Sequence, residues 1–444
     1  MDYTKDMRHE HFMYTSEISA TADVLFYWHM KAGAAERMIP PWLSLSVLFV
    51  EGGETELAQR IGFELRLGPF RKKWVAESIA FRDGDAFSDI EVKGFLHYGY
   101  HTHRIKALTQ LTSMLEDEVF YRHPFFLPKF FIDKMLLRIF QYRHETIRRD
   151  LLCYARYKAP PMRILLSGAS GLIGSALRCF LQGGGHQVVR LARSDLKQEP
   201  KDLTFFEDFD AVIHLAGEPL AKGRWSKAKK EELFASRVDG TKQLVQLLSK
   251  LQHPPKLFLS ASAIGYYGSR DEPVTEESSP GNGFLSKLCK EWEGATEGLK
   301  SRGIRVAIAR FGYVLSSKGG LLHSLLPLFR LGLGMTIASG NQKMSWVSLE
   351  DTVEALYHIL MKEEIQGAVN ITSPHPVSQK VFAKTLAKAL ARPCVLSLPR
   401  AFLIGEKAKE LLLPSLEAIP KQLQDHGFVF SYPHLDEYLH FCLK

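Results

Sequence analysis

The clearest hydrophobic pattern of this 444-residue chain lies between residues 161 and 193. An apolar run at 164–166 precedes three spaced glycines, and apolar side chains at helical spacing then continue to Leu181. A second apolar run, Val188-Val189, follows. This succession of strand, turn, amphipathic helix and strand opens a βαβ unit, so it predicts a doubly wound parallel α/β sheet from residue 162 onward.

The turn between the first strand and the helix has the spacing G-x-x-G-x-x-G. Glycines at such a turn let the backbone approach a pyrophosphate, and the helix N-terminus presents free N–H groups to it. The alternative is a tight turn in some other α/β protein. Dinucleotide binding is favoured, and the predicted contact residues are Gly168, Ser170, Gly171, Leu172, Ile173 and Gly174.

The residues after the second strand bear on the choice of cofactor. An acidic side chain there would bind the ribose 2′-hydroxyl of NAD. The chain has Arg193-Ser194, whose guanidinium and hydroxyl suit a 2′-phosphate. A solvated arginine that begins a loop is the alternative. We predict NADP in preference to NAD.

Residues 10 to 157 show the shorter, alternating runs of an α+β domain, and residues 157–161 are the candidate linker to the next domain. Gly and Pro clusters separate the predicted strands. A helix is predicted over 22–38 and a long helix after Pro128. The predicted strands lie near 17–20, 45–50, 56–67, 73–82, 86–98 and 102–113.

This order, with the stretches PPWLSLSV and LGPFRKKWVAES, resembles the START/Bet v 1-like family, also called polyketide-cyclase-like. The resemblance implies a helix-grip fold, in which a curved sheet wraps around the last helix and often encloses an apolar cavity. The aromatic residues of the segment either line a cavity for a hydrophobic ligand or form an ordinary core. They are Phe63, Phe70, Trp74, Phe81, Phe87, Phe95, Tyr98, Phe120 and Tyr121.

Composition limits the remaining classes. The formal net charge of +8 is modest, its basic clusters are typical of solvated faces, and no nucleic-acid-binding motif accompanies them. The five scattered cysteines lack metal-ligand spacing, so no metal site is predicted and a reducing, cytoplasmic location is expected. Neither a signal peptide nor a membrane-spanning run is apparent. The pattern gives no oligomeric state.

From residue 162 to 441 a series of motifs occurs in a recognisable order: SGASGLIGSAL, DAVIHLAGEPLAKGRWSKAKKEELFASRVDGT, FLSASAIGYYG, ARFGYVLSSKGGLL, FRLGLGMTIASGNQKMSWVSLEDTVEAL, GAVNITSPHPVS and IPKQLQDHGFVFSYP. They resemble the epimerase-family proteins, an atypical group of extended short-chain dehydrogenases. The resemblance implies a Rossmann-like domain over 162–444 with a smaller C-terminal substrate lobe from about residue 370.

The strand at 210–217 ends in small residues, which let the backbone lie against an adenosine ribose, and the predicted cofactor contacts there are Leu215, Ala216 and Gly217. His214 is either a ligand contact or, more commonly for such a position, a core histidine. By resemblance Arg237 contacts the cofactor phosphates, and Glu232 pairs with Arg237 or meets the adenosine. A surface ion pair is the alternative for both.

The catalytic pattern of this superfamily is incomplete here. It needs a serine or threonine, then a Tyr-x-x-x-Lys helix whose tyrosine transfers the proton. Ser262, on the strand at 257–262, is the candidate serine, and Lys287 is the candidate lysine. The residue four before Lys287 is Gly283, so the usual tyrosine is absent.

Three explanations remain open for the missing acid. Tyr266 or Tyr267 donates the proton, a lysine, substrate group or water does so, or the domain binds NADP without catalysis. The corresponding functions are an NADP-dependent reductase or epimerase-like enzyme acting on a carbonyl or sugar-nucleotide-like substrate, and a non-catalytic NADP sensor. A carrier of a hydrophobic ligand through the N-terminal domain is a further alternative.

Substrate contacts are expected beyond the carboxyl ends of the parallel strands. Arg310 lies at the end of the apolar run 306–309. Trp346, in QKMSWVSLEDTV, either stacks on a substrate ring or packs in the core. These two residues complete the predicted site.

Overall fold

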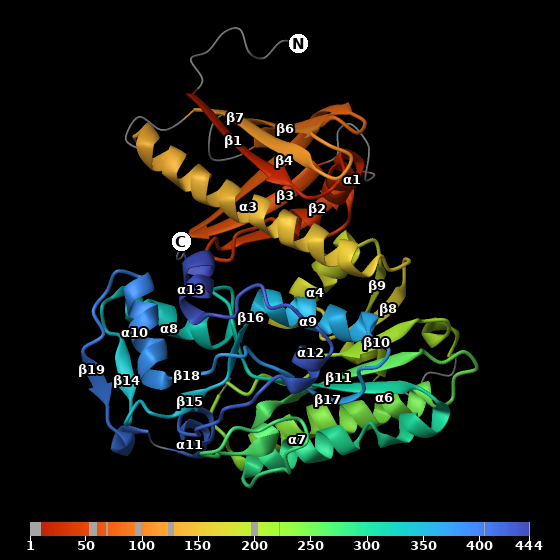
Figure 1. Cartoon of the computed structure of the whole chain (residues 1–444), viewed down its shortest axis with the longest axis vertical. Helices are drawn as coiled ribbons and strands as arrows, with labels where there is room; N and C mark the ends of the chain where they lie inside the picture. The colour runs from red at the N-terminus through yellow and green to blue at the C-terminus, as the bar shows by residue number, and fades with distance from the viewer. Residues whose placement is uncertain are drawn as a thin grey trace. The chain divides into compact units, whose positions relative to one another are not determined.

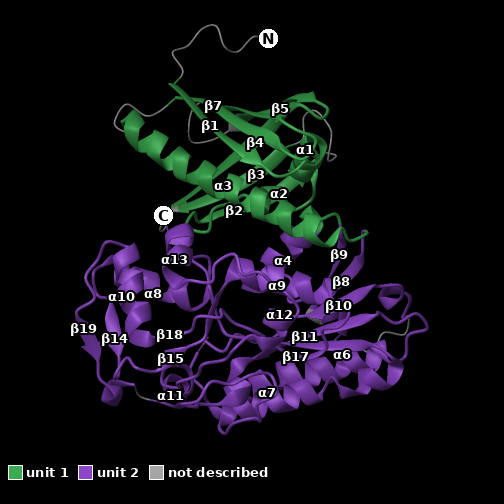
Figure 2. Ribbon diagram, in the orientation of Figure 1, with its two compact units in different colours: residues 1–160, 182–185, 444 green, residues 161–181, 186–443 purple. Residues whose placement is uncertain are grey.

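The computed structural model describes residues 10–52, 60–67, 70–93, 99–122, 128–196, 203–221, 223–403 and 405–443. The chain forms two compact units (Figure 2). Unit 1 comprises residues 1–160 with 182–185 and 444, and unit 2 comprises 161–181 and 186–443. Among the described residues, no helix has the length and apolar character needed to cross a membrane.

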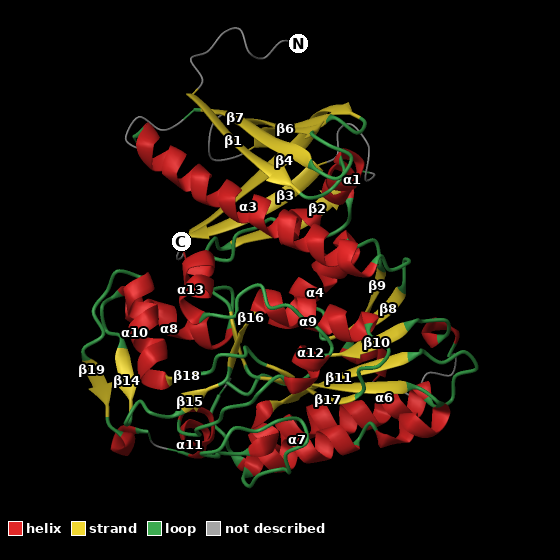
Figure 3. Ribbon diagram, viewed as in Figure 1, coloured by secondary structure: helices red, strands yellow, loops and turns green. Residues whose placement is uncertain are grey.

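Unit 1 is an antiparallel sheet with a long helix. The strands follow the spatial order β1-β7-β6-β5-β4-β3-β2, and α3 (Lys129–Tyr157) runs along the sheet (Figures 1 and 3). Two short helices, α1 (Ala22–Met30) and α2 (Ala34–Arg37), follow the first strand. The strands are β1 (Glu10–Ile18), β2 (Leu45–Glu51), β3 (Arg60–Leu67), β4 (Phe70–Arg82), β5 (Ala86–Lys93), β6 (Gly99–Ala107) and β7 (Ser113–Tyr121).

Alternation of side chains creates the inner face of this sheet. Along β7, every second residue from Ser113 to Tyr121 is buried, as the period of two in a half-buried strand requires. Leu115 packs with Ile147 and Leu151 of α3 in the main core of the unit. The predicted α+β unit with a closing long helix is therefore confirmed.

An ion pair lies inside unit 1. Arg37 of α2 donates two hydrogen bonds, both 2.8 Å, to the carboxylate of Asp150 on α3. The two side chains are only 6% and 0% exposed. Such a bidentate pair fixes the geometry of both helices, and either charge left alone would be buried without compensation.

Unit 2 contains a six-stranded, wholly parallel sheet in the order β17-β12-β11-β10-β8-β9. Helices α4 and α9 lie on one face, where Phe180 and Tyr357 meet edge to face, and α6 and α7 lie on the other (Figure 1). The predicted doubly wound sheet is confirmed. Its strands are β8 (Arg163–Ser167), β9 (Gln187–Leu191), β10 (Ala211–His214), β11 (Leu257–Ala263), β12 (Arg305–Phe311) and β17 (Gly367–Ile371).

Two groups of helices complete unit 2. Those around the sheet are α4 (Leu172–Gly183), α5 (Lys227–Phe234), α6 (Gly240–Leu248), α7 (Phe284–Gly294), α9 (Leu349–Met361) and α12 (Lys421–Asp425). A smaller lobe has its own core, to which α8 (Gly320–Arg330), α10 (Gln379–Ala389) and α13 (Leu435–Leu443) contribute. This core draws on residues from 315 onward, so it begins earlier in the chain than the predicted boundary near 370.

Short strand pairs and one further helix surround that lobe. The pairs are β13 (Tyr313–Leu315) with β16 (Trp346–Ser348), β14 (Met335–Ile337) with β19 (Leu396–Leu398), and β15 (Lys343–Met344) with β18 (Val377–Ser378). The further helix is α11 (Glu406–Leu412).

The Arg37–Asp150 pair gives the first prediction. Replacing Asp150→Asn leaves the Arg37 charge buried without its counter-ion, so we expect the opening free energy of α3 to fall by about 3–5 kcal/mol. Hydrogen exchange of α3 peptides in the full chain measures it. Glu77→Gln, in the more exposed Arg60–Glu77 pair, is the control and should cost less than about 1 kcal/mol. Equal effects of the two changes would refute the argument.

Candidate functional site

The candidate site lies where the order of the parallel strands reverses. The chain passes from β8 outward to β9 and then returns across β8 to β10 on its other side. In doubly wound sheets, ligands bind in the crevice beyond the carboxyl ends of the strands at this reversal. The glycine turn after β8 and the segment 215–217 after β10 meet there.

The glycine turn allows a close backbone approach. Gly168 has a φ of +69°, and a Cβ placed on it would lie 2.7 Å from the carbonyl carbon of Leu215. A Cβ on Gly174, in the first turn of α4, would lie 2.2 Å from the carbonyl oxygen of Gly168. Both positions therefore exclude larger residues, which explains two of the three glycines sterically.

The outer part of the same turn is open. Ser170 and Gly171 are exposed, Leu172 and Ile173 are half-buried, and α4 begins at Leu172. The first N–H groups of a helix have no partner within the helix and carry the positive end of its dipole. The turn thus provides a cradle that fits an anionic diphosphate.

The hydroxyl of Ser167 fixes the segment after β10, residues 215–217, through two contacts. Ser167 lies 2.7 Å from His214 Nδ1, and its hydroxyl also accepts the N–H of Ala216 at 3.3 Å. Burial lowers the pKa of His214 to about 4, so its ring is neutral. Of the two interpretations of His214, the structure fits the core histidine, whose partner is a serine hydroxyl.

Arg237 contacts the segment 215–217 and the residue that follows it. It lies in a π-helical segment, Ala235–Asp239, and donates to the carbonyl oxygen of Glu218 at 2.9 Å. A Cβ on Gly217 would lie 3.2 Å from the guanidinium carbon of Arg237, so the two residues are in contact. Glu232 instead pairs with Lys229 at 3.0 Å and is 53% exposed. The predicted alternative in which Glu232 pairs with Arg237 is therefore wrong, because Glu232 pairs with Lys229.

The residues after β9 form a tight turn. Arg193 begins it, but the side chain of Arg193 lies outside the described residues. Ser194 donates to Asp195 Oδ1 at 3.1 Å, and Asp195 Oδ2 accepts the N–H of Ala192 at 2.8 Å. Asp195 was missed in the sequence; its carboxylate is occupied with capping the turn.

A polar network lies at the carboxyl ends of β11 and β12. Ser262 donates to Glu293 Oε1 at 2.6 Å, and Arg310 binds both oxygens of Glu293 at 2.8 and 2.7 Å. Register places Ser262 directly beside Arg310 on the adjacent strand. Although burial alone would lower it, pairing with Glu293 raises the pKa of Arg310 above its ordinary value.

The same arginine separates the two tyrosine candidates. Its Nη1 donates to the hydroxyl of Tyr267 at 2.8 Å, and that hydroxyl donates to Asn370 at 2.7 Å. Tyr267 is fully buried, and burial raises its pKa to about 12. Tyr266 is half-buried, with the Arg310 guanidinium 3.6 Å from its ring centre. Tyr266 is therefore the less buried of the two tyrosines.

The buried face of helix α7 differs from the one that the sequence predicted, in which Lys287 faced the site. Its buried side chains include Ser286 and Cys289, and burial raises the pKa of the Cys289 thiol to about 11. Lys287 is exposed, so the structure does not bring it to Ser262. Glu293 takes the place beside the serine. Sequence reasoning missed it because it searched the helix for a lysine rather than for the partner of a buried arginine.

Trp346 has the second of its two predicted environments. It is fully buried in the core of the smaller lobe, stacks with Tyr438, and donates its indole N–H to the carbonyl of His375 at 3.0 Å. As a predicted substrate contact Trp346 is contradicted by this burial, because no face of its ring is open. Packing is its role.

In unit 1, a cavity of about 200 Å³ opens beside the sheet. Four of the predicted aromatic residues line it: Phe63, Trp74, Phe81 and Phe87. Phe70 is instead 76% exposed and Tyr121 is in the core, while Phe95 and Tyr98 lie outside the described residues.

Comparisons with known proteins agree with this geometry. The model of the NAD dependent epimerase/dehydratase family matches residues 164–372, and that of a domain of unknown function, DUF1731, matches 398–442. An epimerase family protein of Mycobacterium bovis, Mb2239, is 40% identical over 290 residues, which are 62% of this chain and 96% of the relative. The human epimerase family protein SDR39U1 is 33% identical over 289 residues, 62% of this chain and 97% of the relative.

Two crystal structures extend the comparison. A nucleoside-diphosphate sugar epimerase from Corynebacterium glutamicum is 28% identical with a TM-score of 0.81, and the match covers 97% of this chain and 90% of that one. Human SDR39U1 isoform 2, solved with NADPH, is 31% identical with a TM-score of 0.58 over 63% of this chain and 98% of its own.

Fold and site together define a Rossmann-type protein of the epimerase/dehydratase class. The chain belongs to the epimerase family. This confirms the resemblance of residues 162–441. The two family models leave the START-like assignment of residues 10–157 a prediction.

The network around Glu293 gives the second prediction. Replacing Glu293→Gln removes the charge opposite the buried Arg310, so we expect unit 2 to lose about 3 kcal/mol of stability and its calorimetric melting temperature to fall by several degrees. Glu297→Gln is the control, because its pair with Lys300 is exposed. Unchanged melting of the Glu293→Gln protein would show that the pair does not stabilise the strand ends.

Proposed function

We propose that this protein is an NADP(H)-dependent oxidoreductase or epimerase-like enzyme that acts on a small carbonyl or sugar-nucleotide-like substrate. The observation that carries the proposal is the glycine turn packed against Leu215 at the strand reversal. Beside it, at the ends of the next two strands, lie Ser262, Tyr266 and Arg310. A cofactor cradle and a group of polar side chains would thus share the carboxyl edge of the sheet.

The choice of cofactor rests on two supports. The human relative was solved with NADPH, and Arg193-Ser194 follows β9, where the adenosine ribose is bound in such folds. In the bound complex, the free N–H groups of the first turn of α4 would hold the diphosphate, beside the exposed residues Ser170 and Gly171. Leu215, Ala216 and Gly217 would lie along the ribose, with Arg237 beneath them. The nicotinamide supplies or accepts a hydride.

The remaining residues would handle the substrate. Tyr266 would donate a proton through its hydroxyl, and Arg310, 3.6 Å from its ring centre, would orient the ring. Ser262 would hold the substrate oxygen when its hydroxyl turns from Glu293. Glu293 acts as a positioning residue, because it fixes Ser262 and Arg310 together. The sugar-nucleotide class is suggested by the description of the Corynebacterium relative.

One observation favours a second candidate, a non-catalytic NADP sensor. Ser262, Glu293, Arg310 and Tyr267 satisfy one another's hydrogen bonds without any ligand. A closed network of this kind also suits a site that only binds. The cavity of unit 1 supports the carrier alternative. Its volume of about 200 Å³, however, is smaller than that of common ligand pockets, which weighs against a large hydrophobic ligand. The cytoplasmic location rests on the five free cysteines, four of them buried.

Cofactor preference can be measured directly. Replacing Arg193→Glu puts a negative charge opposite the 2′-phosphate, so the Kd for NADP⁺ should rise by about 10–100-fold, while that for NAD⁺ changes by less than about threefold. Calorimetric titration of the full chain measures both. Arg190→Glu, on the exposed side of β9, is the matched control. An equal loss for both dinucleotides would remove the argument for NADP.

Catalysis is tested by NADPH oxidation against a panel of carbonyl compounds and nucleoside-diphosphate sugars. For a substrate that reacts, Tyr266→Phe and Ser262→Ala should each lower kcat by about 10²–10⁴-fold, because each removes a hydroxyl from the reacting atoms. Tyr27→Phe, in unit 1, is the control and should keep full activity. If the wild-type chain binds NADPH and no compound oxidises it, the sensor replaces the enzyme.

A further inference from the structure

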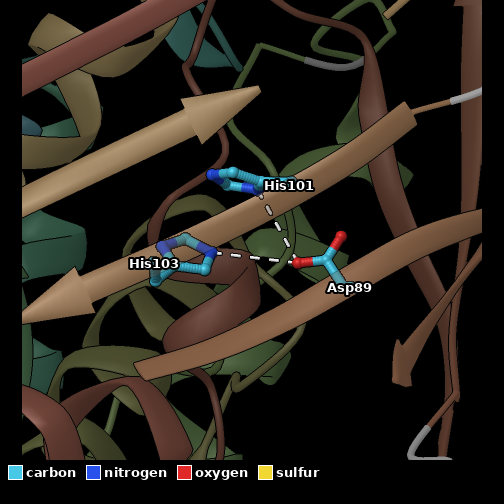
Figure 4. A group of neighbouring side chains, drawn as sticks. All are labelled: Asp89, His101 and His103. Atoms are coloured by element: carbon cyan, nitrogen blue, oxygen red, sulfur yellow. Dashed lines mark ion pairs between the residues drawn. The ribbon is translucent and has the colours of Figure 1, made fainter. Parts of the chain in front are cut away.

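The cavity of unit 1 contains a cluster of polar groups that its apolar lining does not explain. Asp89 on β5 and His101 and His103 on β6 all line it. In the antiparallel register Asp89 stands directly opposite His101, and His103 follows two residues later on the same face. Their side chains converge from two neighbouring strands (Figure 4).

The spacing of the three donor atoms suits a cation. Asp89 Oδ2 lies 3.6 Å from His101 Nδ1 and 3.8 Å from His103 Nε2, and all three atoms lie within 4.8 Å of one another. Neither of the two distances is a hydrogen bond. Ligands about 2.0–2.1 Å from a tetrahedral metal ion are about 3.4 Å apart, so the two distances from Asp89 need to close by only a few tenths of an ångström. The third distance, between the two histidine nitrogens, is at most 4.8 Å.

A second carboxylate directs the lone pair of His101. Asp117, opposite His103 on β7, lies 2.8 Å from His101 Nε2 and 2.5 Å from His103 Nδ1. An ionised carboxylate can only accept, so His101 Nε2, which is hydrogen-bonded to Asp117, carries the ring hydrogen. In a neutral ring the lone pair of His101 then belongs to Nδ1, which faces Asp89, as Nε2 of His103 also does.

The lone pair of His101 Nδ1 and the Asp89 oxygen that faces it repel unless something positive lies between them. We propose that Asp89, His101 and His103 form a binding site for one divalent transition-metal ion, with Asp117 as the positioning residue behind both histidines. A carboxylate behind a metal-ligating histidine is the usual arrangement at such sites, where it fixes the tautomer. This proposal is independent of the dinucleotide site in unit 2.

The surroundings fit the geometry of such an ion. Arg143 lies near both Asp89 and Asp117. Three protein ligands leave the remaining coordination positions open toward the cavity. Two histidines and one carboxylate with open positions are typical of reactive zinc and non-haem iron sites rather than of closed structural ones.

His144 and Ser16 hold Asp117 from its other side. His144 Nε2 contacts Asp117 Oδ2, and His144 Nδ1 lies 2.6 Å from the hydroxyl of Ser16. Asp117 thus has its own partners whether or not an ion is bound. Changes to Asp89 therefore test the metal site without removing the support behind the histidines.

The test is metal binding by the untagged full chain. After chelator treatment, Co²⁺ should bind with one equivalent per chain and give the visible absorption of a nitrogen- and oxygen-ligated site, and Zn²⁺ should displace it. Asp89→Asn and His103→Gln should each weaken Co²⁺ binding by more than about 100-fold, and Asp117→Asn by about 10–100-fold. His11→Gln, on β1 of the same sheet and 46% exposed, should bind as the wild type does.

Unfolding of a variant is distinguished from loss of a ligand by circular dichroism and by NADP⁺ titration of unit 2, which should be unchanged in every variant. Asp89→Asn is the decisive change, because this half-exposed side chain is replaced by one of the same size. The proposal is overturned if the wild-type chain binds neither Co²⁺ nor Zn²⁺ stoichiometrically. The positive charge between Asp89 and the two histidines would then be a shared proton. It is also overturned if a folded Asp89→Asn protein binds as tightly as the wild type.

Discussion

The close approach of two backbone segments at Gly168 is the constraint on which the dinucleotide site depends. The carbonyl carbon of Leu215 occupies nearly the space that a Cβ would need, and Gly174 closes onto the same glycine from α4. This contact aligns the N-terminus of α4 and the segment after β10 along one crevice. Without this contact, the N-terminus of α4 and residues 215–217 would not lie close enough together to bind the same ligand.

The second constraint is electrostatic. Glu293 and Arg310 are an almost fully enclosed pair, only 11% and 5% exposed, at the ends of the strands where chemistry would occur. Pairing lets a carboxylate and a guanidinium persist there, and it fixes Ser262 and orients Tyr266 at the same time. The candidate lysine, Lys287, is exposed and lies apart from this pair, and Tyr266 is the less buried of the two tyrosines.

Most of the fold and of the cofactor cradle could be predicted from the sequence, because each depends on local signals. The glycine spacing, the apolar runs around it and the alternation of β7 are all readable along the chain. Glu293 and the Asp89–His101–His103 cluster could not be found in this way, since register and packing bring their members together from separate elements. The burial of Trp346 likewise depends on a lobe whose core spans distant segments.

The central claim is that the crevice between β8 and β10 holds NADPH with its nicotinamide at the Ser262–Tyr266 edge. A crystal structure of the full chain with NADPH tests this most directly. We expect the diphosphate to lie over the first turn of α4. We also expect the hydroxyl of Tyr266 or Ser262 to lie close enough to nicotinamide C4 to form a hydrogen bond with a substrate bound there. NADPH bound elsewhere, or a nicotinamide far from both hydroxyls, would contradict it.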